Sequence, residues 1–184
     1  MPMTSKTKYA LLGILNLYPM SGYDLKKFCD EVVSQFWNEN YAHIYPVLKE
    51  LEKEGLATTQ TAQAAGRPVK RIYSITEKGK QELKDWLLKP AETPPQRYEF
   101  ILKLFFSADV PAGHLAENIL QYKEMNQKAL ELYDKNEKET LEVITDENNK
   151  SRKLILMTIS CGRLQSDAMV KWCDETLKIL ETMK

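Results

Sequence analysis

Three cationic side chains stand close together in a stretch of sequence that contains no acid. Residues 55–76 include Arg67, Lys70 and Arg71 and neither aspartate nor glutamate. The planar fork of an arginine suits a phosphate group or the DNA minor groove, and Arg67 lies in a Gly-Arg-Pro turn sequence. The alternative for Arg67 is an ordinary exposed loop arginine. Alternation along a strand would put either Lys70 or Arg71 on the far face.

A second candidate group lies at the start of a helix expected over residues 42–54. Ile44, Val47, Leu48 and Leu51 recur at spacings of three and four and predict its buried face. A recognition helix contacts DNA base edges with its N-terminal end. The polar or exposed residues expected at that end are Asn40, His43, Tyr45, Pro46 and Lys49. In the plainer interpretation Asn40 only caps the helix, Tyr45 packs beneath the hairpin, and His43 and Lys49 are solvated.

These two groups need a framework that brings them to one face. The helix ends at Gly55, and strands follow at 56–61 and 69–75, joined by a hairpin at 62–68. Thr76 then caps a helix that runs to residue 88. This order of helix, strand, basic turn, strand and helix is that of a winged helix-turn-helix. Such a module places one helix in the DNA major groove and the hairpin against the DNA backbone.

Two further helices precede this module. The first is expected over residues 7–18, where Pro19 ends it, and the second over 22–36, with Ser21 as its N-cap. The side chains expected to be buried are Leu11, Ile14, Leu15 and Tyr18 in the first helix and Tyr23, Leu25, Phe28, Val32 and Phe36 in the second.

A proline-rich segment at residues 89–95 divides the chain. We therefore expect a DNA-binding domain over 1–89, a linker over 90–96 and a helical domain over 97–184. The fold class is mainly α with a small β-hairpin.

The rear domain is expected to hold helices over 98–108, 112–143 and 148–183 with coiled-coil-like packing. The 112–143 helix carries an apolar stripe of Leu115, Ile119, Tyr122, Met125, Ala129 and Leu132. The two long helices would pack as a hairpin and leave apolar surface for a second chain. The residues predicted to form this dimer interface are Leu154, Met157, Cys161, Leu164, Ala168 and Trp172.

Composition excludes several other classes of protein. The formal net charge is zero, but residues 1–90 hold 13 Lys/Arg and 10 Asp/Glu, so the front half is the basic one. The three cysteines lack zinc-ligand spacing, and no metal or other cofactor is expected. No spacing suggests a catalytic triad or a phosphate loop, so we do not expect an enzyme. No apolar run reaches the roughly 20 residues that span a bilayer, and we expect a cytoplasmic protein.

Four short motifs in order and spacing resemble the PadR family of bacterial transcription regulators. They are Tyr9 to Leu15, Ser21 to Leu25, Ile44 to Leu48, and Gly66-Arg67-Pro68 with Tyr73 to Gly79. The helical rear resembles the C-terminal domain of the subgroup that includes virulence-gene activators.

The resemblance implies a homodimer that binds double-stranded DNA at a roughly palindromic operator, one winged helix per half-site. Family members commonly repress transcription, and some respond to small aromatic compounds, whereas others activate. The tryptophans could line a pocket for such an effector, but ordinary core and interface packing is the favoured interpretation. A winged helix used only for protein–protein assembly is the alternative function, because the fold alone does not guarantee DNA binding.

Overall fold

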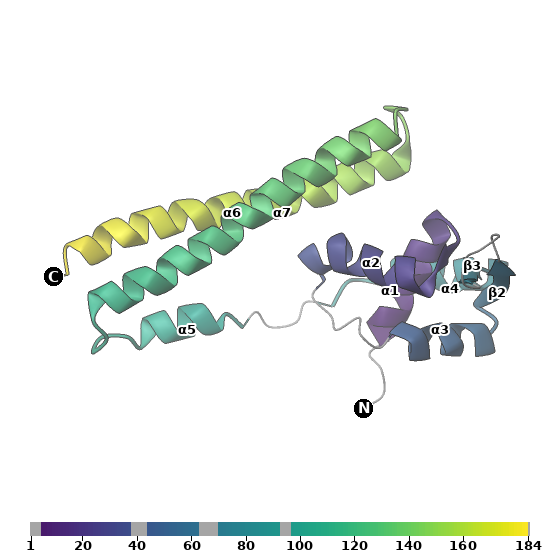
Figure 1. Ribbon diagram of the computed structural model, residues 1–184, viewed down its shortest axis with the longest axis horizontal. Helices are drawn as coiled ribbons and strands as arrows, with labels where there is room; N and C mark the ends of the chain where they lie inside the picture. The colour runs from purple at the N-terminus through teal and green to yellow at the C-terminus, as the bar shows by residue number, and fades with distance from the viewer. Residues whose placement is uncertain (1–4, 38–43, 63–69, 93–96, 184) are drawn as a thin grey trace. The chain divides into compact units, whose positions relative to one another are not determined.

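The computed structural model describes residues 5–37, 44–62, 70–92 and 97–183. The chain forms two compact units, Met1–Thr93 and Pro94–Lys184. The first unit carries a small sheet among helices, and the second is helical (Figure 1). This confirms the expected fold class of a mainly helical protein with a small β-hairpin.

The first helix, α1 (Ser5–Leu17), buries one face as expected, with one error. Leu11, Ile14 and Leu15 are buried, and so is Leu12. Tyr18 was predicted to be buried but is 55% exposed. It follows the last residue of α1, so the helical spacing that placed it on the inner face no longer applies there.

The second helix, α2 (Gly22–Glu31), is shorter than predicted. Its N-cap is Ser21, as expected, whose side chain accepts a hydrogen bond from the Asp24 amide at 3.2 Å. After Glu31 the chain continues into a 3-10 turn, η1 (Val33–Gln35).

The buried face of this segment also differs from the prediction. Tyr23 and Phe36 were expected inside, but they are 68% and 60% exposed. The buried side chains are Leu25, Cys29 and Val33, each four residues after the last. The early end of α2 and the change of winding in η1 move Phe36 away from the core.

The segment from α3 to α4 follows the prediction closely. Helix α3 (Ile44–Lys53) buries Ile44, Val47, Leu48 and Leu51, as expected. Gly55 ends it with a φ of +70°, and the Leu56 amide donates to the Leu51 carbonyl at 2.8 Å, which is a glycine C-cap. Strands β2 (Ala57–Ala62) and β3 (Lys70–Ile75) pair antiparallel, and α4 (Glu77–Leu87) begins at its Thr76 cap.

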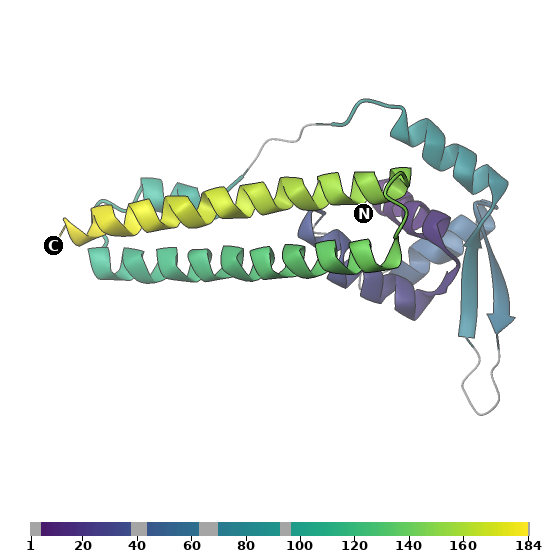
Figure 2. The ribbon, with the colours of Figure 1, turned by 90° about the horizontal axis from the view of Figure 1, so that it is seen from above.

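A short strand, β1 (Met20–Ser21), was not predicted. It pairs antiparallel with β3, with Met20 opposite Tyr73 and Ser21 opposite Ile72. The described strands therefore have the order β1-β3-β2, with β3 in the middle. Figure 2 shows β2 and β3 side by side, with their far ends directed away from the helices of this unit.

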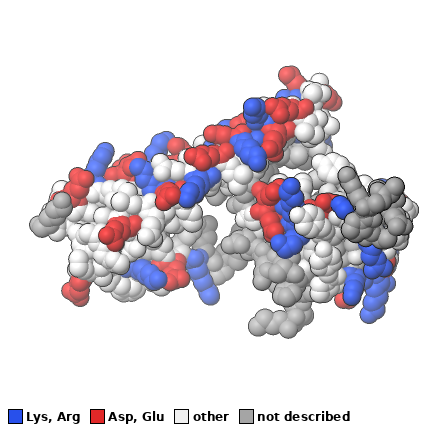
Figure 3. All heavy atoms as spheres, in the orientation of Figure 1, with Lys and Arg blue, Asp and Glu red and all other residues white. Residues whose placement is uncertain are grey.

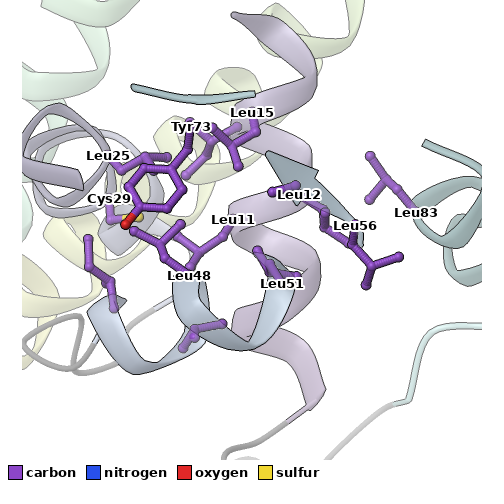
Figure 4. Packing of buried hydrophobic residues seen from close by; sticks show 14 of the residues in the cluster. Leu11, Leu12, Leu15, Leu25, Cys29, Leu48, Leu51, Leu56, Tyr73 and Leu83 are labelled. Carbon is purple, nitrogen blue, oxygen red and sulfur yellow. The ribbon is translucent and has the colours of Figure 1, made fainter. Parts of the chain in front are cut away.

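The core of the first unit lies between α1, α2, α3 and the sheet. Figure 4 shows the side chains that meet there. Those that are almost completely buried include Leu11, Leu12, Leu15, Leu25, Ile44, Leu48, Leu51 and Leu56. This single cluster fixes the position of α3 relative to β3, which are the two elements that carry the predicted contacts.

The second unit is built on an antiparallel pair of long helices, α6 (Ala112–Val143) and α7 (Lys150–Glu181), which pack along their lengths (Figure 2). The buried positions repeat every seven residues, as in a coiled coil. They are Ile119, Asn126 and Tyr133 in α6 and Ile159, Ser166, Cys173 and Leu180 in α7. Met125 was predicted to lie on the inner stripe of α6 but is 56% exposed, because the stripe follows Ile119 and Asn126.

A short helix, α5 (Glu99–Phe105), packs against this pair. The Phe100 ring stacks on Tyr122 with centroids 4.4 Å apart and meets Trp172 edge-on at 5.9 Å. None of the helices within the described residues is long and apolar enough to cross a membrane.

Candidate nucleic-acid interface

The N-terminal half of α3 presents an exposed polar face above a buried apolar one. Tyr45 is 49% exposed, and Pro46 and Lys49 are also exposed. Pro46 is the third residue of α3, where its missing N–H removes no helical hydrogen bond. These three predicted contact residues therefore share one accessible surface on the first two turns of α3.

The start of β3 provides two cations. Lys70 and Arg71 pair with Ala62 and Thr61 of β2 at the far end of the hairpin, and both are exposed. Strand alternation directs them to opposite faces, as the sequence suggested. However, burial on β3 begins only at Ile72 and Tyr73, so no neighbouring element covers either cation.

The charge on this surface is not neutralised within the described residues, where Lys49, Lys70 and Arg71 form no ion pair. Several other cations of the unit are paired; Lys26, for example, contacts Asp30 at 2.6 Å on α2. In Figure 3, Lys and Arg gather at the lower edge of the end where Figure 1 draws α3, β2 and β3. Such an accumulation of positive charge attracts polyanions.

Two acids near the C-terminal end of α3 make contacts inside the unit instead. Glu52 accepts a hydrogen bond from the Thr59 hydroxyl of β2 at 2.5 Å. Glu54, just beyond α3, accepts one from the Lys8 ammonium at 2.8 Å. These contacts tie the C-terminal end of α3 to the hairpin and to α1, and they keep both carboxylates engaged.

A charged network joins α1, α4 and the end of α3. Lys8 also lies 3.3 Å from Glu82, and the Tyr9 hydroxyl donates to Glu82 at 3.1 Å. The hydrogen bonds from Tyr9 and Lys8 hold the pKa of Glu82 below its ordinary value of 4.5. Burial acts to lower the pKa of Lys8, but the hydrogen bonds and charges of Glu54 and Glu82 outweigh it and raise that pKa.

Three predicted contact residues, Asn40, His43 and Arg67, lie outside the described residues, and their contacts remain predictions.

Sequence reasoning missed the strand β1, which brings the start of α2 against β3. The signal for it was weak, because only Met20 and Ser21 separate Pro19 from the helix.

The predicted dimer interface of α7 is largely exposed in the single chain. Leu154, Met157 and Leu164 are 53%, 66% and 67% exposed, and Cys161 and Ala168 are exposed too. Trp172 differs, because it is partly buried against Phe100 of its own chain. The exposed stripe lies off the seam that α7 shares with α6.

Two family models together match most of the chain. One, described as the transcriptional regulator PadR-like family, matches residues 11–85, and the other, described as virulence activator alpha C-term, matches residues 96–181. The chain belongs to the PadR-like family. Members of the PadR-like family are transcriptional regulators and not enzymes.

Individual PadR-like proteins are similar to this chain over different lengths. The negative transcriptional regulator PadR of Bacillus subtilis (strain 168) is 41% identical over 100 residues, which is 54% of this chain and 55% of that protein. The match thus spans about half the length of this curated relative.

Solved structures match over nearly the whole chain. The smu.1604c protein of Streptococcus mutans UA159 is 30% identical with a TM-score of 0.78, covering 93% of this chain and 98% of that one. Bacillus subtilis PadR in complex with operator DNA is 27% identical with a TM-score of 0.75, covering 94% and 98%. The same Bacillus protein in complex with p-coumaric acid is 25% identical with a TM-score of 0.71, covering 95% and 94%.

Proposed function

We propose that this protein is a sequence-specific DNA-binding transcription regulator that binds operator DNA through α3 and the hairpin of β2 and β3. The observation that carries the proposal is the exposed, un-neutralised surface formed by the start of α3 and the start of β3. Its shape and charge suit a helix in the major groove with a basic hairpin beside it. The Bacillus relative bound to operator DNA supports the same use of the fold.

The two parts of this surface would have different roles in DNA binding. Lys70 and Arg71, with Arg67 of the hairpin turn, would contact phosphates and supply most of the salt-dependent affinity. Most of the α3 residues would read base edges in the major groove and supply sequence preference, while the Tyr45 hydroxyl would contact a backbone phosphate. The α3 group comprises Asn40, His43, Tyr45, Pro46 and Lys49.

A homodimer would place two such surfaces on one operator. The exposed apolar stripe of α7 is the surface we assign to the second copy, because monomers rarely leave such continuous apolar area in water. A twofold-symmetric dimer requires a roughly palindromic operator, with half-sites about one helical turn apart or a multiple of it. We propose repression as the sign of regulation, as in the Bacillus negative regulator.

Release by a small aromatic effector would complete this function, and the Bacillus relative solved with p-coumaric acid supports it. Such a ligand would act by favouring a dimer geometry whose α3 helices no longer match the half-site spacing. It shifts this equilibrium only as far as its affinities for the two geometries differ. The protein would act in the cytoplasm.

A mobility-shift assay of the full chain on the DNA upstream of its own gene, with excess competitor and footprinting of the shifted band, tests the proposal. We expect a protected palindrome and an affinity that falls steeply as salt increases. The alternative is a winged helix that serves only protein–protein assembly. Absence of binding both to this DNA and to a pool of random duplexes would favour that alternative and overturn the proposal.

A further inference from the structure

Gly22, the first residue of α2, lies against the Cε1 edge of the aromatic ring of Tyr45. A Cβ atom at position 22 would sit 2.6 Å from Cε1 of Tyr45, 3.3 Å from Cζ and 3.4 Å from Cδ1. Real Cβ atoms do not approach other atoms so closely, so the ring occupies space that only a glycine leaves open. Gly22 itself is buried, whereas Tyr45 remains half-exposed.

Backbone conformation does not explain a glycine at this position. Among the described residues, Gly55 is the only glycine with a positive φ, so Gly22 has a φ that other residues adopt freely. Glycine is also a poor helix former, and an alanine at this helical position would ordinarily be favoured. The feature that requires glycine is the contact with the Tyr45 ring.

The position of Gly22 is set by its neighbours on both sides. Ser21 pairs with Ile72 in the sheet, and its side chain caps α2 by accepting the Asp24 amide at 3.2 Å. Gly22 is the next residue, so the position of its backbone is fixed relative to β3, the strand that begins with Lys70 and Arg71. The ring of Tyr45 therefore rests on a surface whose position is fixed relative to the basic hairpin.

We propose that Gly22 is a positioning residue for DNA recognition, which holds the ring of Tyr45 so that its hydroxyl meets a backbone phosphate at the start of α3. This inference rests on the proposed function. A hydroxyl already in place binds without the entropy cost of ordering a mobile side chain. Gly22 would touch no DNA itself, and its effect on affinity would act entirely through Tyr45.

A double-mutant cycle tests this coupling on the full chain with the footprinted operator fragment. The proteins are wild type, Gly22→Ala, Tyr45→Ala and the combined variant, and the readout is the dissociation constant from fluorescence anisotropy. We expect each single change to weaken binding by about 2- to 10-fold, the range that ordering one side chain represents. In the Tyr45→Ala background, Gly22→Ala should have no further effect, because the contact is already gone.

The matched control is Gly13→Ala, because a Cβ at position 13 of α1 meets nothing within 4 Å. It should leave affinity unchanged. Thermal melting of each variant separates loss of fold from loss of positioning, and the combined variant contains no clash that would prevent folding. Independent, additive losses from the two substitutions would overturn the coupling, as would a Gly22→Ala protein that is folded and binds like wild type.

The outcome also separates this inference from the function on which it rests. If the wild-type protein binds no DNA, both the proposed function and the role of Gly22 are overturned. A wild-type protein that binds its operator, together with a Tyr45→Ala variant of equal affinity, would keep the regulator and overturn the role of Gly22.

Discussion

The phenol ring of Tyr133 lies against the backbone of Gly162, so that α6 and α7 approach closely at this level of the second unit. A Cβ added at Gly162 would clash with Cζ and the hydroxyl oxygen of Tyr133. Tyr133 is only 7% exposed, and its ring therefore has little room to move. The contact explains why a glycine is tolerated in the interior of a 32-residue helix.

The first prediction is that Gly162→Ala destabilises the protein despite the better helix propensity of alanine. Overpacking costs about 1–3 kcal/mol, whereas the gain in propensity is at most about 1 kcal/mol. We expect a net loss of about 1 kcal/mol in urea unfolding at fixed protein concentration. In a Tyr133→Ala background the same substitution should become stabilising. Gly113→Ala, where a Cβ meets nothing within 4 Å, is the control.

The second prediction concerns the basic hairpin. Arg71→Ala should weaken binding to operator and random DNA by similar factors and reduce the salt slope by about one phosphate contact per protomer. We expect the same of Arg67→Ala. The measurement is the dissociation constant over a salt series. Lys80→Ala serves as control, because Lys80 lies on α4 and is paired with Glu77 at 2.6 Å. A variant that loses affinity only for the operator would instead point to base contact.

The third prediction concerns the exposed stripe of α7. Leu164→Glu should shift the protein toward monomer in sedimentation velocity, because it places a charge in an apolar interface. Leu164 is 67% exposed in the single chain, so the substitution should leave the fold of that chain intact. Val143→Glu, at a 77% exposed apolar residue that ends α6, is the matched control. Trp172→Ala should also loosen the dimer, but its contact with Phe100 makes it the less selective variant. If Leu164→Glu and wild type sediment alike at low concentration, the stripe is not the interface.

The fourth prediction follows from the lowered pKa of Glu82. A carboxylate whose pKa is depressed in the folded state stabilises the fold above its ordinary value of 4.5, and this contribution is lost as pH falls through the folded-state pKa. Wild type should therefore be more stable than Glu82→Gln at neutral pH, and the difference should shrink on acidification below about 4.5. Chemical unfolding across this pH range measures it. Glu181→Gln, at an exposed carboxylate of the second unit, is the control variant. A gap for Glu82→Gln that stays constant with pH would contradict the role assigned to its charge.

Local chemistry made several parts of the fold predictable. Ser21, Gly55 and Thr76 carry cap signals that act on the adjacent backbone, and all three serve as expected. The four apolar residues of α3 are buried as their spacing indicated, and this leaves Tyr45, Pro46 and Lys49 exposed. Short-range spacing was sufficient for these features.

The errors arise where tertiary packing decides. Tyr23 and Phe36 were placed on the apolar stripe of a helix expected over residues 22–36, but the end of α2 at Glu31 removes the helical register on which Phe36 depended. Strand β1 exists only because β3 offers it a partner, which spacing along the chain does not reveal. The seam of α7 was also missed, since Ser166 is polar and Cys173 is small, so the larger apolar residues of the exposed stripe dominated the pattern.

Two buried polar residues, Asn126 and Ser166, lie in the α6–α7 seam. Asn126 lies 17 residues before the end of α6, and Ser166 lies 16 residues after the start of α7, so both stand at about the same distance from the connecting turn. Each is 8% exposed, and the Asn126 amide donates to the Tyr122 carbonyl at 2.8 Å. A buried asparagine in such a seam disfavours other registers, because sliding would oppose it to apolar residues. A buried asparagine in this seam therefore favours one register, which would keep the α6–α7 hairpin at a constant length.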